Sequence, residues 1–189
     1  MEYTIKCVIC GQSGSGKTAI IKRYLEDKFI PTNTYTVGVD FFYKKIDINN
    51  IKYKLHIWDT CGLIHYRSLI QLYYKQANII LYVFTINDLD SEKECLECIT
   101  NTQFPPTTRK YIIGNKTDLL SDKYDFTKSI LYNQCSTNNI RLFECSAKTG
   151  YNVNTIFDTI VDEYKAEYNN NTIQIGINTM PKLSFFKRC

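Results

Sequence analysis

The sequence predicts an α/β fold: a six-stranded, mostly parallel sheet with one antiparallel edge strand, covered by helices on both faces in three layers. Three observations support this. Segments with strand patterns alternate along the chain with segments of helical spacing. The apolar runs 78–84 and 111–114 are continuous, as in strands buried on both faces. Residues 11–18 read G-x-x-x-x-G-K-T between a strand pattern and a helix pattern.

Composition narrows the class of protein. The chain has 189 residues, enough for one domain with a full core. Its net charge of +4 comes from dispersed lysines and arginines, so no nucleic-acid-binding stripe is expected. No apolar run approaches the ~20 residues that span a bilayer. The N-terminus lacks the pattern of a secretory signal, which predicts a cytosolic protein.

The first strand–loop–helix unit predicts a phosphate site. Residues 3–9 form an apolar, β-rich strand, and a helix is expected from about Gly16 to Glu26. Glycines let the backbone N–H groups between them turn inward around phosphates, and the helix N-terminus adds its dipole. Lys17 supplies positive charge and the Thr18 hydroxyl can bind Mg²⁺, the pattern of a P-loop NTPase fold. The predicted phosphate-binding residues are Ser13, Gly14, Ser15, Gly16, Lys17, Thr18 and Gly62.

A hairpin follows a polar loop at 27–36. Two strands, 39–48 and 51–58, are joined by Asn49-Asn50, a tight-turn pair. Asp59 closes the second strand, where a carboxylate can hold Mg²⁺ through a water. Gly62 then lets a backbone N–H approach a γ-phosphate without side-chain hindrance.

The remaining elements alternate as the fold requires. Ser91 is expected to cap a helix over 91–102, because serine oxygen accepts from the first free N–H groups. Loops after parallel strands meet at one edge of the sheet, so the P-loop, Asp59, Asn115 and Ser146 are expected to converge there. Further helices are predicted at 66–76, 126–136 and 152–168, and a short strand at 141–145.

Eight cysteines raise the possibility of zinc. Cys7-x-x-Cys10 and Cys95-x-x-Cys98 form two short pairs, but Cys7 and Cys10 face opposite sides of one strand. The second pair lies in a predicted helix far along the chain. Free thiols are therefore favoured over a zinc site or disulfides.

Two short motifs indicate guanine. Asn115-Lys116-x-Asp118 places a carboxylate that can accept from both N1–H and the 2-amino group, a donor pair that adenine lacks. Ser146-Ala147-Lys148 offers a backbone N–H for the 6-oxo group and an apolar stem beside the base.

With these motifs in order, the chain resembles the Ras superfamily of small GTPases, and most closely the Rab subfamily. Segments 37–41, 54–60 and 73–77 are similar to Rab-specific segments, and the resemblance covers about residues 3–168. It implies that Thr36 ligates Mg²⁺ and senses the γ-phosphate, and that Phe29 packs on the base. It also implies a monomer that binds Rab-type effectors, an exchange factor and an activating protein. The implied effector surface comprises Val37, Gly38, Val39, Asp40, Phe41, Trp58 and Tyr73, although core packing is an alternative role for its aromatic residues.

One position departs from the family. Leu63 stands where the family has the glutamine that orients the attacking water, and leucine has no donor or acceptor. Intrinsic GTP hydrolysis is therefore expected to be weak. His65, two positions on, is a less favoured substitute for that group. An activating protein could still supply the missing groups in trans.

The pattern changes after residue 168. Residues 1–168 are expected to form the GTPase domain, and 169–189 a flexible tail ending in Cys189. The resemblance implies geranylgeranylation of Cys189, recognition by prenyl-dependent carrier proteins and peripheral attachment to the cytosolic face of a membrane. Basic and aromatic residues near the end favour an anionic surface, whereas the alternative is an unmodified thiol.

The favoured function is thus a GTP- and Mg²⁺-dependent switch of vesicle transport. A non-cycling module that holds GTP permanently, as a scaffold or decoy for trafficking proteins, is the rival, and Leu63 is the residue that supports it. A P-loop kinase or ATPase is a more distant alternative.

Overall fold

The computed structural model describes residues 2–31, 35–48, 51–63, 66–102, 104–121 and 125–178. Its contacts divide the chain into two units, Met1–Val153 and Asn154–Cys189. The first unit holds the sheet and four of the helices, and the second holds nearly all of the last helix.

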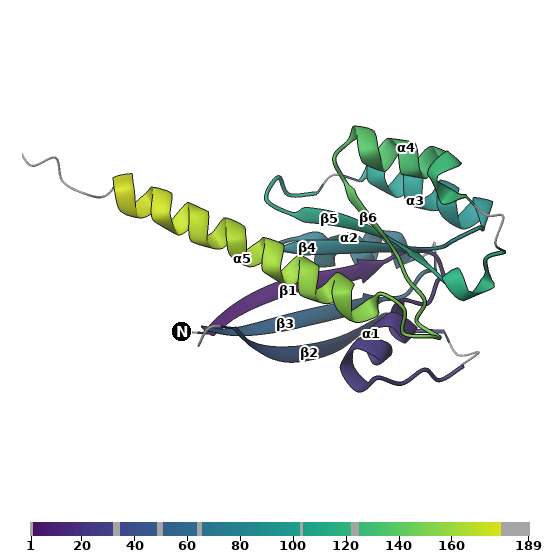
Figure 1. Ribbon diagram of the computed structural model, residues 1–189, viewed down its shortest axis with the longest axis horizontal. Coiled ribbons are helices and arrows are strands. Elements are labelled where there is room, and N and C mark those ends of the chain that lie inside the picture. The colour runs from purple at the N-terminus through teal and green to yellow at the C-terminus, as the bar shows by residue number, and fades with distance from the viewer. Residues whose placement is uncertain are drawn as a thin grey trace, which may run out of the picture. The chain divides into compact units, whose positions relative to one another are not determined.

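A six-stranded sheet organises the first unit (Figure 1). The strand order is β2-β3-β1-β4-β5-β6, and only the β2–β3 pair is antiparallel. This confirms the predicted fold class, including the antiparallel edge strand. The strands are β1 (Glu2–Cys10), β2 (Val39–Ile48), β3 (Ile51–Thr60), β4 (Ile79–Thr85), β5 (Arg109–Asn115) and β6 (Arg141–Glu144).

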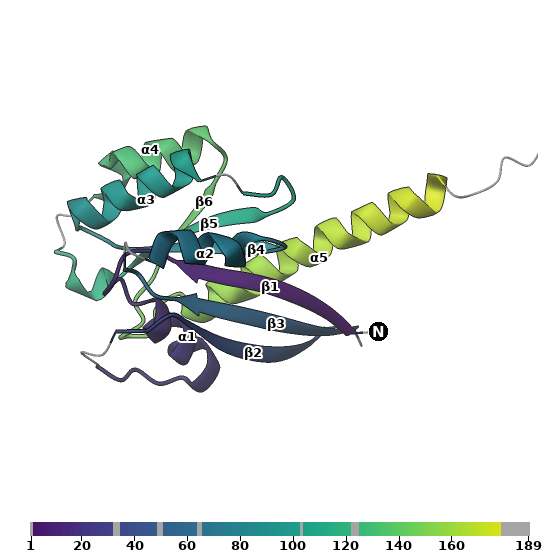
Figure 2. The ribbon, with the colours of Figure 1, turned by 180° about the vertical axis from the view of Figure 1, so that it is seen from behind.

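Helices connect the parallel strands, as crossovers in such a sheet must. Figure 2 shows α2, α3 and α4 from behind, near β4 and β5. The α-helices are α1 (Lys17–Glu26), α2 (Arg67–Tyr74), α3 (Leu89–Asn101), α4 (Ile130–Thr137) and α5 (Val153–Asn178), and two short 3₁₀ helices are η2 (Thr117–Leu119) and η3 (Phe126–Lys128).

Two predicted helix boundaries are wrong. Asp88, not Ser91, caps α3, because its side chain accepts from the N–H groups of Asp90 and Ser91. Ser91 is instead buried, and its hydroxyl accepts from the N–H of Thr85 at 2.9 Å. The single helix predicted over 126–136 is divided, because Ser129 has extended backbone and caps α4 by accepting from Tyr132 N–H.

The sheet buries apolar side chains on both faces. Val8 and Cys10 join α2, α3 and α4 in one core cluster that includes Ile70, Cys95 and Leu131. Cys7 and Ile9 point to the opposite face because side chains alternate along a strand. On that face α1 buries Ile20, Ile21 and Tyr24.

The last helix is longer than predicted. α5 extends to Asn178, beyond the predicted end at 168. Apolar side chains at a spacing of three to four residues are buried along α5, at Val153, Ile156, Phe157, Ile160 and Val161. Among the described residues, no helix combines the length and apolar character needed to cross a membrane.

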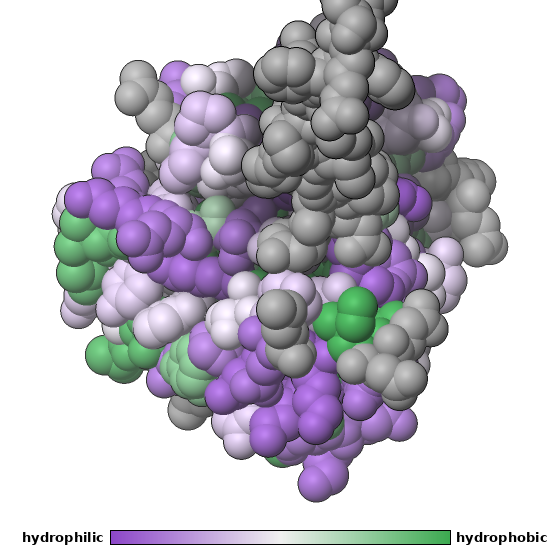
Figure 3. Space-filling model, turned by 90° about the vertical axis from the view of Figure 1, so that its left-hand side faces the viewer, coloured by the Kyte–Doolittle hydropathy of each residue, from purple (hydrophilic) through white to green (hydrophobic). Residues whose placement is uncertain are grey.

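The surface drawn in Figure 3 is mostly hydrophilic, and the described cysteines are free thiols. In the face drawn in Figure 3, hydrophilic side chains predominate among the described residues and hydrophobic ones form small separate groups. The described cysteines are all free thiols, and no group of three or more potential metal ligands from His, Cys, Asp or Glu occurs within the described part of the chain.

Candidate functional site

The P-loop joins β1 to α1 at the carboxyl edge of the sheet. Lys17, the first residue of α1, donates from Nζ to the carbonyls of Gly11 at 2.8 Å and Gln12 at 2.9 Å. The side chain is buried, and burial lowers the pKa of Lys17 while the nearby Asp59 carboxylate opposes that effect. The P-loop thus holds the Lys17 ammonium group against its own backbone carbonyls.

Three predicted metal-binding residues meet beside the P-loop. Thr18 Oγ1 donates to Asp59 Oδ2 at 2.5 Å and lies 3.0 Å from Thr36 Oγ1. Asp59 is fully buried, and burial raises its pKa to about 6. The carboxylate oxygen Asp59 Oδ1 is buried without a hydrogen-bond partner among the described residues. Such a set of hard oxygen donors fits Mg²⁺.

Gly62 brings the segment after β3 onto the P-loop. Its carbonyl accepts from Ser13 N–H at 3.1 Å, and a Cβ at Gly62 would lie 2.2 Å from that nitrogen. Only glycine fits such a close approach. Leu63 follows directly, and 40% of its surface is exposed. Together with Ile70 and Tyr74 it lines a cavity of about 210 Å³.

Asn115 connects the P-loop to the loop after β6. Its Nδ2 donates to the carbonyl of Ser15 at 2.8 Å, and its Oδ1 accepts from Ala147 N–H at 3.0 Å. A Cβ at Gly16 would lie 2.3 Å from Asn115 Nδ2, so the side chain lies directly on the loop. This contact confirms that the loops after β1, β5 and β6 converge.

Two neighbouring side chains favour the ionised form of the Asp118 carboxylate. Ser146 Oγ donates to Asp118 Oδ1 at 2.6 Å, and Lys148 Nζ lies 3.5 Å from Asp118 Oδ2. Burial alone would raise the pKa of Asp118, but the hydrogen bonds from Ser146 and Lys148 outweigh it and lower that pKa. The carboxylate therefore stays ionised, the form that accepts from two donors.

A cavity of about 480 Å³ is lined by the P-loop, by the start of α1 and by residues of the loops after α1, β3 and β5. Its lining includes Ile30, Pro31 and Tyr35, which the sequence analysis did not single out because they lie in a segment read only as a polar loop. Tyr35 is 69% exposed and Ile30 is 53% exposed. The predicted site residues that line the cavity are Ser13, Gly14, Gly16, Lys17, Thr18, Phe29, Thr36, Gly62 and Lys116.

The predicted effector aromatics form a continuous group on another part of the surface. Phe41 on β2 packs edge-on against Trp58 on β3, with ring centroids 4.9 Å apart. The Trp58 ring packs against that of Tyr73 on α2, with ring centroids 5.3 Å apart. Phe41 is 47% exposed and Val37 is 83% exposed, whereas Trp58 and Tyr73 are half-buried. The group is thus part core and part surface, and its binding role stays a prediction.

Some predicted positions lie outside the described residues. His65, the less favoured substitute for the missing glutamine, is one, and Cys189 at the end of the tail is another. Arg23 is a further residue for which the sequence predicted no role, and it donates to the carbonyls of Ala147 and Lys148. A polar arginine on a surface helix carries no local signal of such contacts.

Comparison with known proteins agrees with this arrangement. The family model described as "Ras family" matches residues 6–166. Ras-related protein Rab-8A of Gallus gallus is 30% identical over 199 residues, covering 98% of this chain and 96% of that protein. Rab-8A of Bos taurus is 33% identical over 168 residues, covering 88% and 81%. Ras-related protein RABE1e of Arabidopsis thaliana is 31% identical over 166 residues, covering 87% and 76%.

The family model thus covers most of the chain, and the chain aligns with 76% to 96% of the length of these relatives. Together with the P-loop, the paired threonines and the Asn115–Asp118 segment, these matches confirm the predicted family. The chain belongs to the Ras family of small GTPases and, within it, to the Rab subfamily.

Proposed function

We propose that this protein is a Rab-like switch of vesicle-mediated transport that binds GTP and GDP with Mg²⁺ and hydrolyses GTP slowly. The observation that carries the proposal is the contact of the Thr18 hydroxyl with both Asp59 and Thr36. These contacts support the proposal, because a P-loop hydroxyl, a buried carboxylate and a residue of the following loop would together supply oxygen ligands for one cation. When bound, Mg²⁺ would neutralise charge on the β- and γ-phosphates.

The switch would depend on two segments that reach the nucleotide cavity. Thr36 and Gly62 both line it, one from the loop before β2 and the other from the loop after β3. A γ-phosphate favours the arrangement in which both segments are ordered, and its loss releases them. Because Val37 to Phe41 continue directly from Thr36, ordering Thr36 would also shape the predicted effector surface.

Guanine would be held by the residues around Asn115. Asp118 would accept from N1–H and the 2-amino group, and the loop 146–148 would donate a backbone N–H to the 6-oxo group. Phe29 and Lys116 would flank the base, since both line the cavity.

Hydrolysis would require an oriented water. That water attacks the γ-phosphorus, the bond from this phosphorus to the β–γ bridging oxygen breaks, and GDP and phosphate leave. Leu63 cannot hold the water, because its side chain has neither donor nor acceptor. The side chain instead lines a neighbouring cavity together with Ile70 and Tyr74. GTP would therefore persist until an activating protein supplies the missing groups.

Membrane attachment is part of the same proposal. Geranylgeranylation of Cys189 would attach the protein peripherally to the cytosolic face of a membrane, and carrier proteins would shield the lipid in solution. An exchange factor and Rab-type effectors would complete the cycle, with the protein acting as a monomer.

A second candidate function is favoured by Leu63 alone. A chain that cannot turn over GTP could serve as a permanently occupied scaffold or decoy for trafficking proteins. The two candidates differ in a single respect, which is whether bound GTP is ever hydrolysed.

The test uses the purified full-length chain. The nucleotide carried by the protein is extracted and identified, and bound GTP labelled at the γ-phosphate is then followed in a single turnover with Mg²⁺. Slow release of phosphate that an activating protein of the Rab type accelerates supports the switch. Release that no activating protein accelerates supports the scaffold. Prompt unassisted turnover contradicts the assignment of Leu63, and preference for ATP over GTP contradicts the guanine site.

A further inference from the structure

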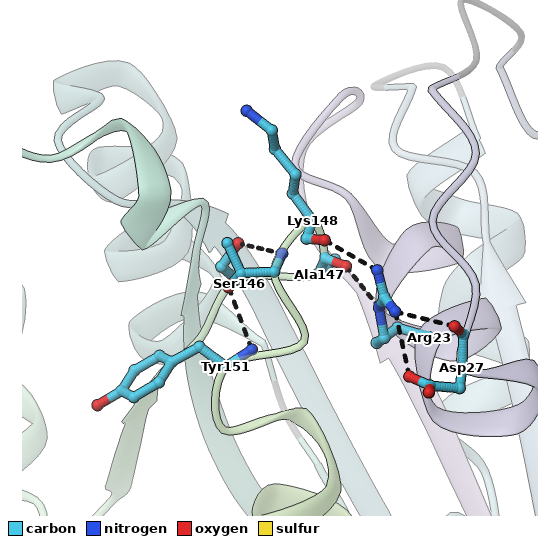
Figure 4. A network of polar contacts seen from close by, with 7 residues as sticks. Arg23, Asp27, Ser146, Ala147, Lys148 and Tyr151 are labelled. Atoms are coloured by element: carbon cyan, nitrogen blue, oxygen red, sulfur yellow. Dashed lines mark hydrogen bonds and ion pairs between the residues drawn. The ribbon is translucent and has the colours of Figure 1, made fainter.

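Arg23, in the last turn of α1, contacts both sides of the guanine-binding region (Figure 4). Its Nε donates to the carbonyl of Ala147 at 3.0 Å, and its Nη2 donates to the carbonyl of Lys148 at 2.8 Å. Its Nη1 donates to the carbonyl of Asp27 at 2.9 Å and to Asp27 Oδ1 at 3.1 Å. One guanidinium thus connects two segments that are far apart in the sequence.

On one side, these bonds fix the backbone of the loop after β6. A guanidinium is planar and presents its donors as a rigid fork, so binding two successive carbonyls sets the orientation of both peptide planes. The N–H of Ala147 is held from the other direction by Asn115 Oδ1 at 3.0 Å. The loop that is proposed to meet the 6-oxo group is therefore held at Ala147 through both its N–H and its carbonyl.

On the other side, Arg23 holds the segment that leads to Phe29. Asp27 ends α1 in the left-handed conformation, with φ of 52°, and its N–H donates to the carbonyl of Arg23 at 3.0 Å. Phe29, two residues further on, lines the nucleotide cavity. Arg23 therefore lies where the two proposed walls of the guanine site can be fixed relative to each other.

The ion pair between Arg23 and Asp27 contributes little to fixing these two segments. The Asp27 side chain is 90% exposed, and exposed ion pairs are weak because water screens them. The Arg23 side chain is only 15% exposed, so its bonds to the carbonyls are better shielded. Bonds from a charged donor are also stronger than neutral ones.

We propose that Arg23 is a positioning residue that sets the rate of guanine nucleotide release by holding the loop 146–148 against the base. This inference rests on the proposed guanine-binding function. Arg23 acts through the loop and is not expected to touch the nucleotide. Lysine cannot replace it fully, because a single ammonium has no planar fork to bind two carbonyls.

The experiment measures the release of GDP from the full-length chain with Mg²⁺ present. Arg23→Gln is expected to accelerate release by about 10- to 100-fold, the range for lost hydrogen bonds to a charged group. The GDP release rate of Arg23→Lys is expected to lie between those of the parent chain and Arg23→Gln. Lys28→Gln removes the same charge from the adjacent exposed segment and is expected to leave the rate unchanged.

Base analogues separate positioning from general destabilisation. A diphosphate carrying hypoxanthine keeps the 6-oxo group and the N1 proton, so Arg23→Gln should accelerate its release as much as that of GDP. A diphosphate carrying 2-aminopurine lacks both groups, so the effect of Arg23→Gln should shrink to less than about twofold, the error of simple additivity. Arg23→Lys serves the same comparison if Arg23→Gln does not fold.

Two results would overturn the proposal. Equal GDP release from Arg23→Gln and the parent chain would show that the contacts do not control release. Equal acceleration for GDP and the 2-aminopurine analogue would show that Arg23 acts through stability and not through the loop. A parent chain that binds no guanine nucleotide would be a different result, because it would overturn the proposed function itself and the role of Arg23 with it.

Discussion

The amide of Asn115 is hydrogen-bonded to the carbonyl of Ser15, with Nδ2 and the oxygen 2.8 Å apart. These residues are 100 positions apart, one ending β5 and the other in the P-loop. Because Asn115 Oδ1 also accepts from Ala147 N–H, one buried side chain links the proposed phosphate and base sites. Nucleotide affinity should therefore depend on Asn115 even apart from any contact with the base.

Asn115→Ala tests that link. The substitution leaves the Ser15 carbonyl and the Ala147 N–H without their partner, and each such buried group costs about 1–3 kcal/mol. We expect GDP release to accelerate by roughly 5- to 150-fold, the factor that corresponds to a loss of about 1–3 kcal/mol at one of these two groups. Release of a fluorescent GDP analogue after mixing with excess GDP measures it. Asn138→Ala is the control, because the Asn138 side chain donates to Gln134 at the end of its own helix, and an equal effect there would contradict the link.

Asp118→Asn is expected to change base preference. Guanine presents donors at N1 and the 2-amino group, whereas xanthine has an acceptor at position 2, which an amide N–H can meet. GDP affinity should fall by roughly 10- to 100-fold, the range for lost hydrogen bonds to a charged group, while affinity for the xanthine diphosphate rises.

Competition of both nucleotides against one fluorescent ligand measures this preference. Asp125→Asn removes an exposed carboxylate that caps η3 and should leave the preference unchanged. A uniform loss of affinity for both nucleotides in Asp118→Asn would indicate a structural role for Asp118 instead.

Leu63→Gln should restore unassisted hydrolysis. Glutamine adds a donor and an acceptor that can orient the attacking water, and correct positioning changes a rate by about 10²-fold. Release of labelled phosphate in a single turnover measures the change. Leu63→Ala shortens the same side chain without adding polarity, so its rate should match that of the parent. A Leu63→Gln chain that remains as slow as the parent would show that more than this side chain is missing.

Phe84→Ala should destabilise the fold strongly. The ring is fully buried, its centroid is 5.6 Å from that of Phe126, and a Cβ on Gly114 would lie 3.0 Å from its tip. Removing a buried phenylalanine ring costs about 3–5 kcal/mol in the free energy of unfolding.

Urea denaturation with excess GDP and Mg²⁺ measures this free energy. Leu89→Ala, at a position 72% exposed, should change it by less than about 0.5 kcal/mol. A loss below about 1 kcal/mol for Phe84→Ala would indicate that neighbouring side chains fill the space that the ring leaves.

Local patterns in the sequence determined most of the architecture. The continuous apolar run at 78–84 predicted β4, and six of its seven positions, Ile79 to Phe84, are buried. The strand predicted at 51–58 is β3, whose alternate residues Tyr53, Leu55 and Ile57 are buried. The short motifs predicted which side chains would meet, because loops that follow parallel strands share one edge of the sheet.

Helix ends were less predictable, because several nearby residues could serve as caps. Asp88 and Ser91 are both good N-cap residues, and only the buried contact of Ser91 with Thr85 N–H decides between them. At 126–136 two residues likewise act as caps, Asp125 for η3 and Ser129 for α4.

The contacts that join the site were decided by tertiary structure alone. Asn115 with Ser15, Arg23 with Ala147 and Gly62 with Ser13 each connect separate elements, and the Arg23 contact spans 124 positions. Such bonds depend on how strands and loops are placed in three dimensions, and no local periodicity encodes them. The sequence by itself determined the fold and the chemical groups of the site, and the folded chain decided which of those groups hold one another in place.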